Sequence, residues 1–149
     1  MSGPDLLQLA LIVAFLAAMA PFHELAHALA GRALGLSVLE VSVGQGPTLW
    51  EREGRRTALA LHALPLGGRT RLVPRSERLA RSRIFLATLA GPAVHALALA
   101  LALLLAPSPG AEWLRGSPAG AFAFANAVML ATSLVAYRAR FGRCWRRSR

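Results

Sequence analysis

Three long apolar stretches separated by more polar segments dominate the pattern along this 149-residue chain. The first runs from about residue 6, through two histidines, to about residue 35. The second covers 84–106 and the third covers 119–137. As α-helices rising about 1.5 Å per residue, all three can cross a hydrocarbon core about 30 Å thick. The pattern therefore predicts three transmembrane helices.

The segment between the first and second stretches has a different pattern. Residues 38–43 alternate in polarity, and residues 48–52 and 57–63 are typical of short strands. Glycines at 44, 46, 54, 67 and 68 supply turns between them. We expect a small, twisted β-sheet over about 38–73 that lies at the membrane surface. The predicted fold class is a mainly α membrane protein with this sheet between its first two helices, and residues 1–149 are expected to form a single domain.

A cleaved signal peptide is the competing explanation of the first apolar stretch, because residues 18–20 (Ala-Met-Ala) resemble a cleavage site. A signal peptide also requires a positively charged start, and Asp5 is the only charged residue before this stretch. The pattern therefore favours a transmembrane helix that continues through its histidines.

Composition and charge agree with a membrane protein. Apolar residues make up 55% of the chain, and the mean hydropathy is +0.47. The net charge of +10 could indicate nucleic-acid binding, but ten of the seventeen arginines lie at the end of the first apolar stretch or between it and the second, and six lie in the C-terminal tail. The positive-inside rule then places the N-terminus outside and the C-terminus in the cytoplasm. The charge thus indicates orientation and contact with the lipid bilayer, with no nucleic-acid partner. The absence of lysine favours a GC-rich bacterial genome and a bacterial plasma membrane.

Residues 23–27 form the motif HExxH on the first predicted helix. The i, i+4 spacing puts His23 and His27 on one helix face, where both imidazoles could hold one zinc ion at about 2.0–2.1 Å. Glu24 would then lie beside the ion as general base toward a water molecule. Ionisable residues inside a membrane helix are costly and usually functional. The alternative is a structural cluster of histidines hydrogen-bonded to neighbouring helices.

Four motifs occur in a fixed order: HELAHALAGRALG at 23–35, VSVGQGP at 41–47, LPLGG at 64–68 and AGPAVH at 90–95. This ordered set, within about residues 6–105, resembles the site-2 protease family of intramembrane zinc metalloproteases. The resemblance implies that His23 and His27 are zinc ligands and that Glu24 is the general base. It also implies that the sheet, near Gly67 and Gly68, positions an unwound substrate segment along an edge strand.

The sequence departs from that family at the third zinc ligand, which in the family is an aspartate in a DG motif after a third core helix. This sequence has no DG motif, and Asp5, its only aspartate, lies about 27 Å from His23 along one helix. His95 replaces the asparagine of the family's AGPxxN motif, at a depth similar to that of HExxH. His95 could complete a three-histidine zinc site, or fill the asparagine's positioning role, or bond a neighbouring helix. Asn126, at similar depth, could donate to a substrate carbonyl or make an interhelical hydrogen bond.

The sequence therefore predicts a zinc-dependent endopeptidase, with Zn²⁺ as cofactor, that cleaves membrane-tethered proteins. The alternative is a catalytically degenerate pseudoprotease that binds transmembrane segments or a partner membrane protein. A partner subunit, or a second copy in a homo-oligomer, could also supply the missing ligand.

Overall fold

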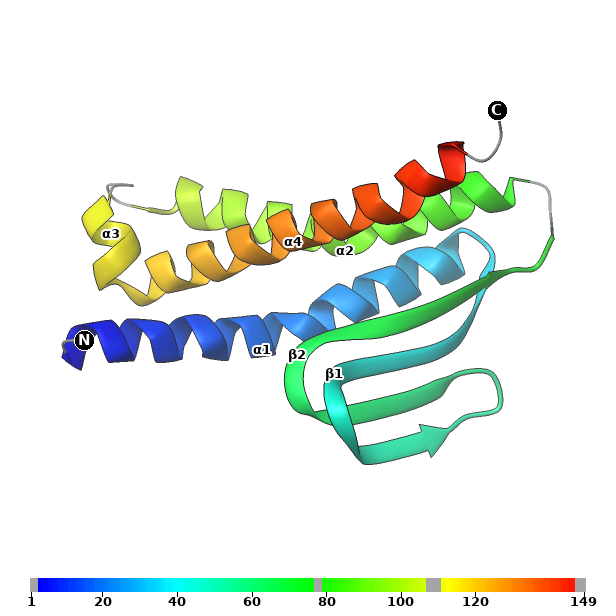
Figure 1. Cartoon of the computed structure of the whole chain (residues 1–149), viewed down its shortest axis with the longest axis horizontal. Helices are drawn as coiled ribbons and strands as arrows, with labels where there is room; N and C mark the ends of the chain where they lie inside the picture. The colour runs from blue at the N-terminus through cyan, green and yellow to red at the C-terminus, as the bar shows by residue number, and fades with distance from the viewer. Residues whose placement is uncertain (1–2, 77–78, 107–110, 147–149) are drawn as a thin grey trace.

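The computed structural model of the chain describes residues 3–76, 79–106 and 111–146. Along the chain, the elements are α1 (Gly3–Ala33), β1 (Leu36–Glu53), β2 (Ala58–Pro74), α2 (Ala80–Leu104), α3 (Ala111–Gly116) and α4 (Pro118–Arg146) (Figure 1). Three of the arginines that predict the orientation, Arg78, Arg147 and Arg149, lie outside the described residues.

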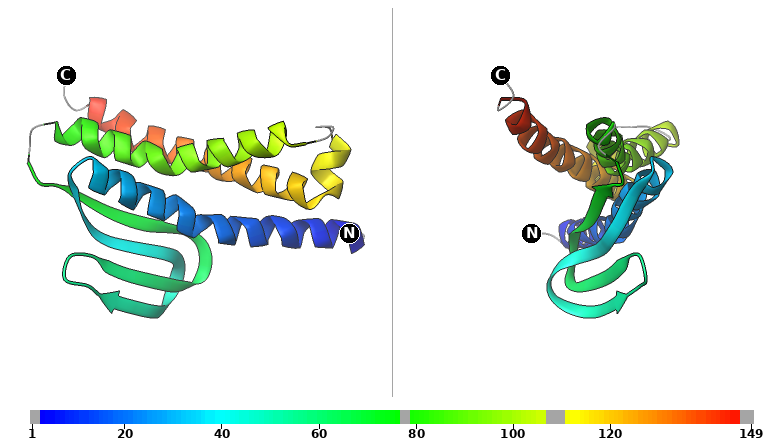
Figure 2. Two further views of the ribbon diagram at one scale, coloured as in Figure 1. Left: turned by 180° about the vertical axis from the view of Figure 1, so that it is seen from behind. Right: turned by 90° about the vertical axis from the view of Figure 1, so that its right-hand side faces the viewer.

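The three long helices α1, α2 and α4 pack against one another, and α4 diverges from the other two toward its C-terminal end (Figures 1 and 2). Each contains a segment long and apolar enough to span a membrane: Asp5–Ala33, Ala80–Leu104 and Pro118–Val135. Their close approach follows from small side chains, because the buried positions between the helices are mostly alanine. Many of the leucines point outward, as they do in helices that face lipid. The predicted fold class is confirmed, and the chain is an integral membrane protein.

The helix ends differ from the sequence-based limits by a few residues at most positions. α1 begins and ends slightly earlier than predicted, as does α2. α4 continues to Arg146, well past the predicted end at 137. The segment between the second and third predicted helices contains the short helix α3 in its described part. Alanine and arginine favour the helical conformation, so the longer α4 and the short α3 both agree with the local helix propensity of the sequence.

The sheet consists of two long, bent strands in place of the three short strands predicted. Residues 36–43 of β1 pair with residues 68–74 of β2, and residues 48–53 of β1 pair with residues 58–62 of β2. Residues 40–43 also have 58–61 as partners on their other side. Among the described strands, residues 68–74 pair only with the first part of β1. This segment of β2, which we call the edge segment, is therefore an edge of the sheet.

Both strands bend at glycines that adopt positive φ angles. Gly44 has φ +88°, and a Cβ atom there would lie 2.6 Å from the backbone oxygen of Leu64. Only glycine adopts such a conformation at low cost in so small a space. Gly67, with φ +73°, makes the bend in β2. The GxGP and PLGG motifs thus form the two bends of the sheet.

The sheet lies to one side of the helix bundle and packs mainly on α1 (Figure 2, right). Gly31 of α1 allows the closest approach, since a Cβ atom there would lie 2.6 Å from Leu72 of the edge segment. The bends reach back along α1 to Glu24, nine residues before the end of this helix, or about 14 Å along its axis. One end of the sheet therefore lies beside an inner turn of a helix that is long and apolar enough to span a membrane.

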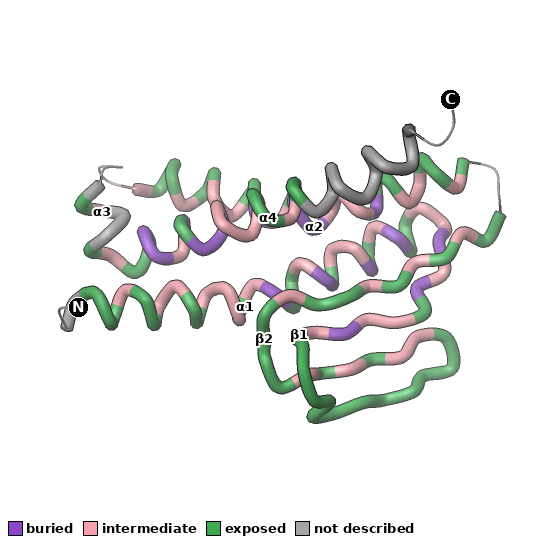
Figure 3. Tube along the Cα trace, viewed as in Figure 1, coloured by how far each residue is buried: buried purple, intermediate pink, exposed green. Residues whose placement is uncertain are grey.

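The buried residues concentrate where α1, α2 and α4 meet and where β1 packs on α1 (Figure 3). Four of them are polar: Glu24, Ser42, His95 and Asn126. A buried polar side chain in an apolar bundle is unfavourable unless it is hydrogen-bonded. These residues therefore mark the candidate site.

Candidate active site

The two histidines of the HExxH motif point the same ring nitrogen toward each other. The Nε2 atoms of His23 and His27 are 3.0 Å apart. Their rings are nearly perpendicular, at 87°. The Nδ1 atom of His27 faces the backbone oxygen of Ala87, in α2, at 2.9 Å. A carbonyl oxygen only accepts, so this Nδ1 carries the hydrogen, and in the neutral ring Nε2 keeps a free lone pair.

His95 and Asn126 form a second layer behind His23. His95 Nε2 lies 3.0 Å from His23 Nδ1, and His95 Nδ1 lies 2.9 Å from Asn126 Oδ1. His95 and Asn126 are fully buried. His95 therefore contacts the nitrogen of His23 that faces away from His27, which is the geometry of the alternative in which His95 bonds a neighbouring helix. The ring does not point its nitrogen at the place where the two Nε2 atoms meet.

Glu24 lies on the face of α1 that meets the sheet. Its side chain is 4% exposed, and the hydroxyl of Thr70 in the edge segment donates to its Oε2 at 2.6 Å. Gly68 packs directly on this carboxylate, since a Cβ atom there would lie 2.6 Å from Glu24 Cγ and 2.5 Å from the backbone oxygen of Ser42. The edge segment thus holds the carboxylate in place and passes immediately beside it.

Gly91 of the AGPAVH motif brings α2 against the histidine pair. A Cβ atom at Gly91 would lie 2.5 Å from His27 Nε2 and 2.6 Å from His23 Nε2. Any larger residue would therefore displace both rings. The glycine of this motif is required by the close approach of two helices at this site.

His23 and His27 can supply two of the ligands of a zinc ion. A separation of 3.0 Å lets both Nε2 atoms bind one ion at the usual zinc–nitrogen distance of about 2.0–2.1 Å. Both Nδ1 atoms have partners, as is normal for zinc-binding histidines. Within residues 3–76, 79–106 and 111–146, no group of three His, Cys, Asp or Glu side chains is arranged to hold a metal.

The structure brings most of the predicted site residues together. Glu24 lies next to Gly68, His23 and His27 lie against Gly91, and His95 and Asn126 lie behind His23. Gly67 is one residue farther away, and a Cβ atom there would be 3.5 Å from Gln45 Nε2. Asn126 donates from Nδ2 to the backbone oxygen of Phe122 at 2.9 Å and accepts from His95, so both ends of its amide are occupied. This arrangement matches the interhelical role of Asn126.

Thr70 is the contact that sequence reasoning missed. It follows the LPLGG motif by two residues, and nothing in its immediate neighbourhood distinguishes it from an ordinary strand threonine. The available signal was strand alternation, which puts residues 68, 70 and 72 on one face of the sheet. Two of these three, Gly68 and Leu72, also pack on α1.

Curated proteins from several bacteria are similar to part of this chain. A protein of Nostoc is 45% identical over 56 residues, which cover 38% of this chain and 15% of that protein. A protein of Campylobacter jejuni is 51% identical over 51 residues, covering 34% and 14%. A protein of Ralstonia nicotianae is 41% identical over 73 residues, covering 45% and 16%. All three are provisionally named zinc metalloproteases. The chain spans about a seventh of the length of these relatives.

The family match is more extensive than these pairwise similarities. Residues 10–140 match peptidase family M50, so the match includes most of α1, the sheet, α2 and most of α4. It contains every residue of the candidate site. The chain therefore belongs to peptidase family M50, the site-2 protease family.

Proposed function

We propose that this protein is a zinc-dependent endopeptidase that cleaves membrane-tethered proteins within the bilayer. One observation carries the proposal: two histidine Nε2 atoms lie 3.0 Å apart beside a buried glutamate, inside a helix apolar enough to span a membrane. Two imidazole nitrogens and a carboxylate at one place are the donor set of a zinc peptidase. Family membership supports the same class of reaction.

His23 and His27 would hold the zinc ion. A bound zinc ion would supply a Lewis acid that acidifies water and polarises the scissile carbonyl. Glu24 would accept a proton from the attacking water and pass it to the amide nitrogen, so that the C–N bond breaks and an amine leaves. Thr70 would keep the carboxylate turned toward the histidines through its 2.6 Å hydrogen bond.

The edge segment of β2 supports a substrate that is extended at the cleavage site. It has β1 on one side, it runs past Glu24, and Gly68 adds no side chain there. An extended peptide could pair with the backbone of such an edge, which would present its carbonyl groups at the height of the histidines. The proposed substrate is a single transmembrane segment that unwinds locally beside this edge.

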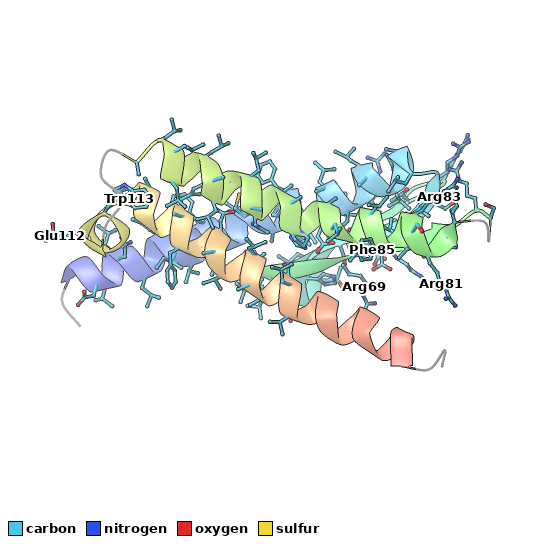
Figure 4. The ribbon with its side chains drawn as sticks, turned by 90° about the horizontal axis from the view of Figure 1, so that it is seen from above. Arg69, Arg81, Arg83, Phe85, Glu112 and Trp113 are labelled. Carbon is cyan, nitrogen blue, oxygen red and sulfur yellow. The ribbon has the colours of Figure 1, made fainter. Side chains whose placement is uncertain are left out.

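The distribution of charge supports a cytoplasmic position for the sheet and the C-terminus. Arg81 and Arg83 lie at the end of the bundle where α2 begins, while Glu112 and Trp113 lie at the opposite end (Figure 4). Arginine near the cytoplasmic leaflet is favoured by the positive-inside rule. We place the N-terminus outside, in a bacterial plasma membrane, with the catalytic group in the cytoplasmic half of the bilayer.

A pseudoprotease that binds transmembrane segments is the alternative. The observation in its favour is the ligand count, since the part of the chain that the structure describes contributes two histidines and no third metal-binding side chain to the site. Catalytic zinc sites normally have three protein ligands. A third ligand from a partner or a second copy would restore catalysis.

Proteolysis in liposomes tests the proposal. The full chain is reconstituted with zinc and a panel of single-span model segments that carry a cytoplasmic fluorescent tag, and tag release is followed. We expect the wild type to cleave members of this panel and Glu24→Gln to be slower by about 10² or more. Glu112→Gln, a matched change at the opposite end of the bundle, should have no effect. Equal activity of the wild type and Glu24→Gln, or zinc-loaded wild type that binds the segments and cleaves none, would overturn the proposal.

A further inference from the structure

A continuous series of hydrogen bonds links α4 to the candidate zinc ligand His23 through α2. It starts at the backbone oxygen of Phe122, 2.9 Å from Asn126 Nδ2. It continues from Asn126 Oδ1 to His95 Nδ1 at 2.9 Å, and from His95 Nε2 to His23 Nδ1 at 3.0 Å. The planes of the His95 and His23 rings are inclined by 27°, with centroids 5.0 Å apart.

The chemistry of these groups fixes the position of every hydrogen in the series. The oxygen of Phe122 only accepts, so the NH₂ group of Asn126 faces it and Oδ1 faces His95. His95 must then donate from Nδ1, which leaves Nε2 of its neutral ring as an acceptor. His23 donates from Nδ1 to that acceptor, and its Nε2 keeps a free lone pair toward His27.

His27 also keeps a free lone pair on its Nε2, because its Nδ1 donates to the backbone oxygen of Ala87. Two bare Nε2 atoms then face each other at 3.0 Å, where neither can donate to the other. This contact is repulsive unless a cation lies between them. A backbone carbonyl of α2 and one of α4 therefore set the tautomers of both candidate ligands.

Burial keeps water away from the hydrogen bonds between Asn126, His95 and His23. His95 and Asn126 are each 0% exposed. Solvent cannot replace a lost partner there, so removal of one member leaves the next one unsatisfied. A histidine at position 95 is also suited to this task in a way that asparagine is not, since the two nitrogens of its ring face opposite sides and reach both α1 and α4.

We propose that His95 and Asn126 are positioning residues that fix the tautomer and ring orientation of His23 and thereby tune metal binding. The inference rests on the proposed function only in assuming that His23 binds zinc. It assigns to His95 neither direct metal binding nor contact with substrate. It also explains why α4, which contributes no candidate ligand among its described side chains, reaches the site.

The test measures metal binding by detergent-purified full-length chain, with zinc affinity from chelator competition and geometry from the visible spectrum of bound Co²⁺. Asn126→Leu removes the acceptor for His95, whereas Asn126→Asp keeps it. Thr88→Val is the matched control, because Thr88 donates to the oxygen of Ile84 within the same helix as His95. Outer partners of zinc ligands commonly change metal affinity by about 10–100-fold.

We expect Asn126→Leu to weaken zinc binding about 10–100-fold and to change the Co²⁺ spectrum, while Asn126→Asp and Thr88→Val bind about as tightly as the wild type. A purely structural role for Asn126 predicts the opposite order, because a buried carboxylate disturbs packing more than leucine does. If Asn126→Leu does not fold, His95→Gln tests the same link, since its amide can still accept from His23 but cannot bridge to Asn126. Wild-type affinity and spectrum in every folded variant would overturn the inference and leave the zinc site intact. A wild-type chain that binds no zinc would overturn the proposed function itself.

Discussion

Gly91→Ala perturbs the candidate metal site through one added methyl group. The new Cβ atom would lie 2.5 Å from His27 Nε2 and 2.6 Å from His23 Nε2 and Cε1. An ordinary van der Waals contact begins at 3.4 Å, so the rings or helix α2 must move by about 0.9 Å. Zinc ligand distances tolerate deviations of about 0.2 Å. The displacement is several times that tolerance, so we expect zinc affinity to fall by about 100-fold or more, beyond the usual effect of an outer partner.

The assay is chelator competition on the purified chain, with zinc content measured after dialysis. Gly31→Ala is the matched control, because it adds the same methyl group to a buried helical glycine. The nearest atom there, 2.6 Å away, is the terminal methyl of Leu72, which can rotate aside. Gly31→Ala should keep wild-type zinc affinity. Wild-type affinity in Gly91→Ala would refute the reasoning that the two Nε2 atoms bind the metal at this contact.

Two other changes separate the proton-transfer group from the metal ligands, and a third tests the bend in the sheet. Gly68→Ala would put a methyl group 2.6 Å from Glu24 Cγ, and we expect normal zinc content with proteolysis reduced about 10-fold or more, as for a poorly placed general base; unchanged cleavage rates would contradict this. Thr70→Val removes the hydrogen bond to the same carboxylate and should slow cleavage about 10-fold or more. Thr132→Val, a change on the exposed side of α4, should leave the cleavage rate unchanged. Equal cleavage rates in these two variants would show that the hydrogen bond is dispensable. Gly44→Ala forces a side chain into a positive-φ position against a backbone oxygen and should destabilise the sheet by about 1–3 kcal/mol. We expect a lower thermal unfolding midpoint. An unchanged midpoint would contradict the role of Gly44 in the bend.

The helices and the paired histidines could be predicted because both depend on local pattern. Long apolar stretches have few alternatives to a membrane helix, and i, i+4 spacing puts two side chains on one face of any helix. The structure accordingly shows three such helices, with His23 and His27 in contact on α1.

The sheet was predicted less completely, because its pairing depends on bends that the sequence indicates only as turns. The positive φ angles of Gly44 and Gly67 turn each strand back, so that residues 40–43 gain partners on both sides. The strand formed by 68–74 has too few alternating residues after two glycines to be recognised alone. Its contact with α1 through Thr70 is a tertiary feature.

For His95, a depth estimate along two helices was enough to predict that it lies close to the HExxH motif. It could not predict which nitrogen of which ring it would meet, since that depends on helix rotation and side-chain rotamers. The contact that the structure shows is with His23 Nδ1, the nitrogen that faces away from His27.

Zinc content of the purified chain tests the central claim most directly. Wild-type protein, His27→Ala and His62→Ala are compared after metal supplementation and dialysis, with His62 as the matched control because it lies on β2 and contacts Thr48 at 3.4 Å. The account predicts about one zinc ion per chain in the wild type and in His62→Ala, and a large loss in His27→Ala. A wild-type chain without zinc, or a His27→Ala chain with as much zinc as the wild type, would contradict it.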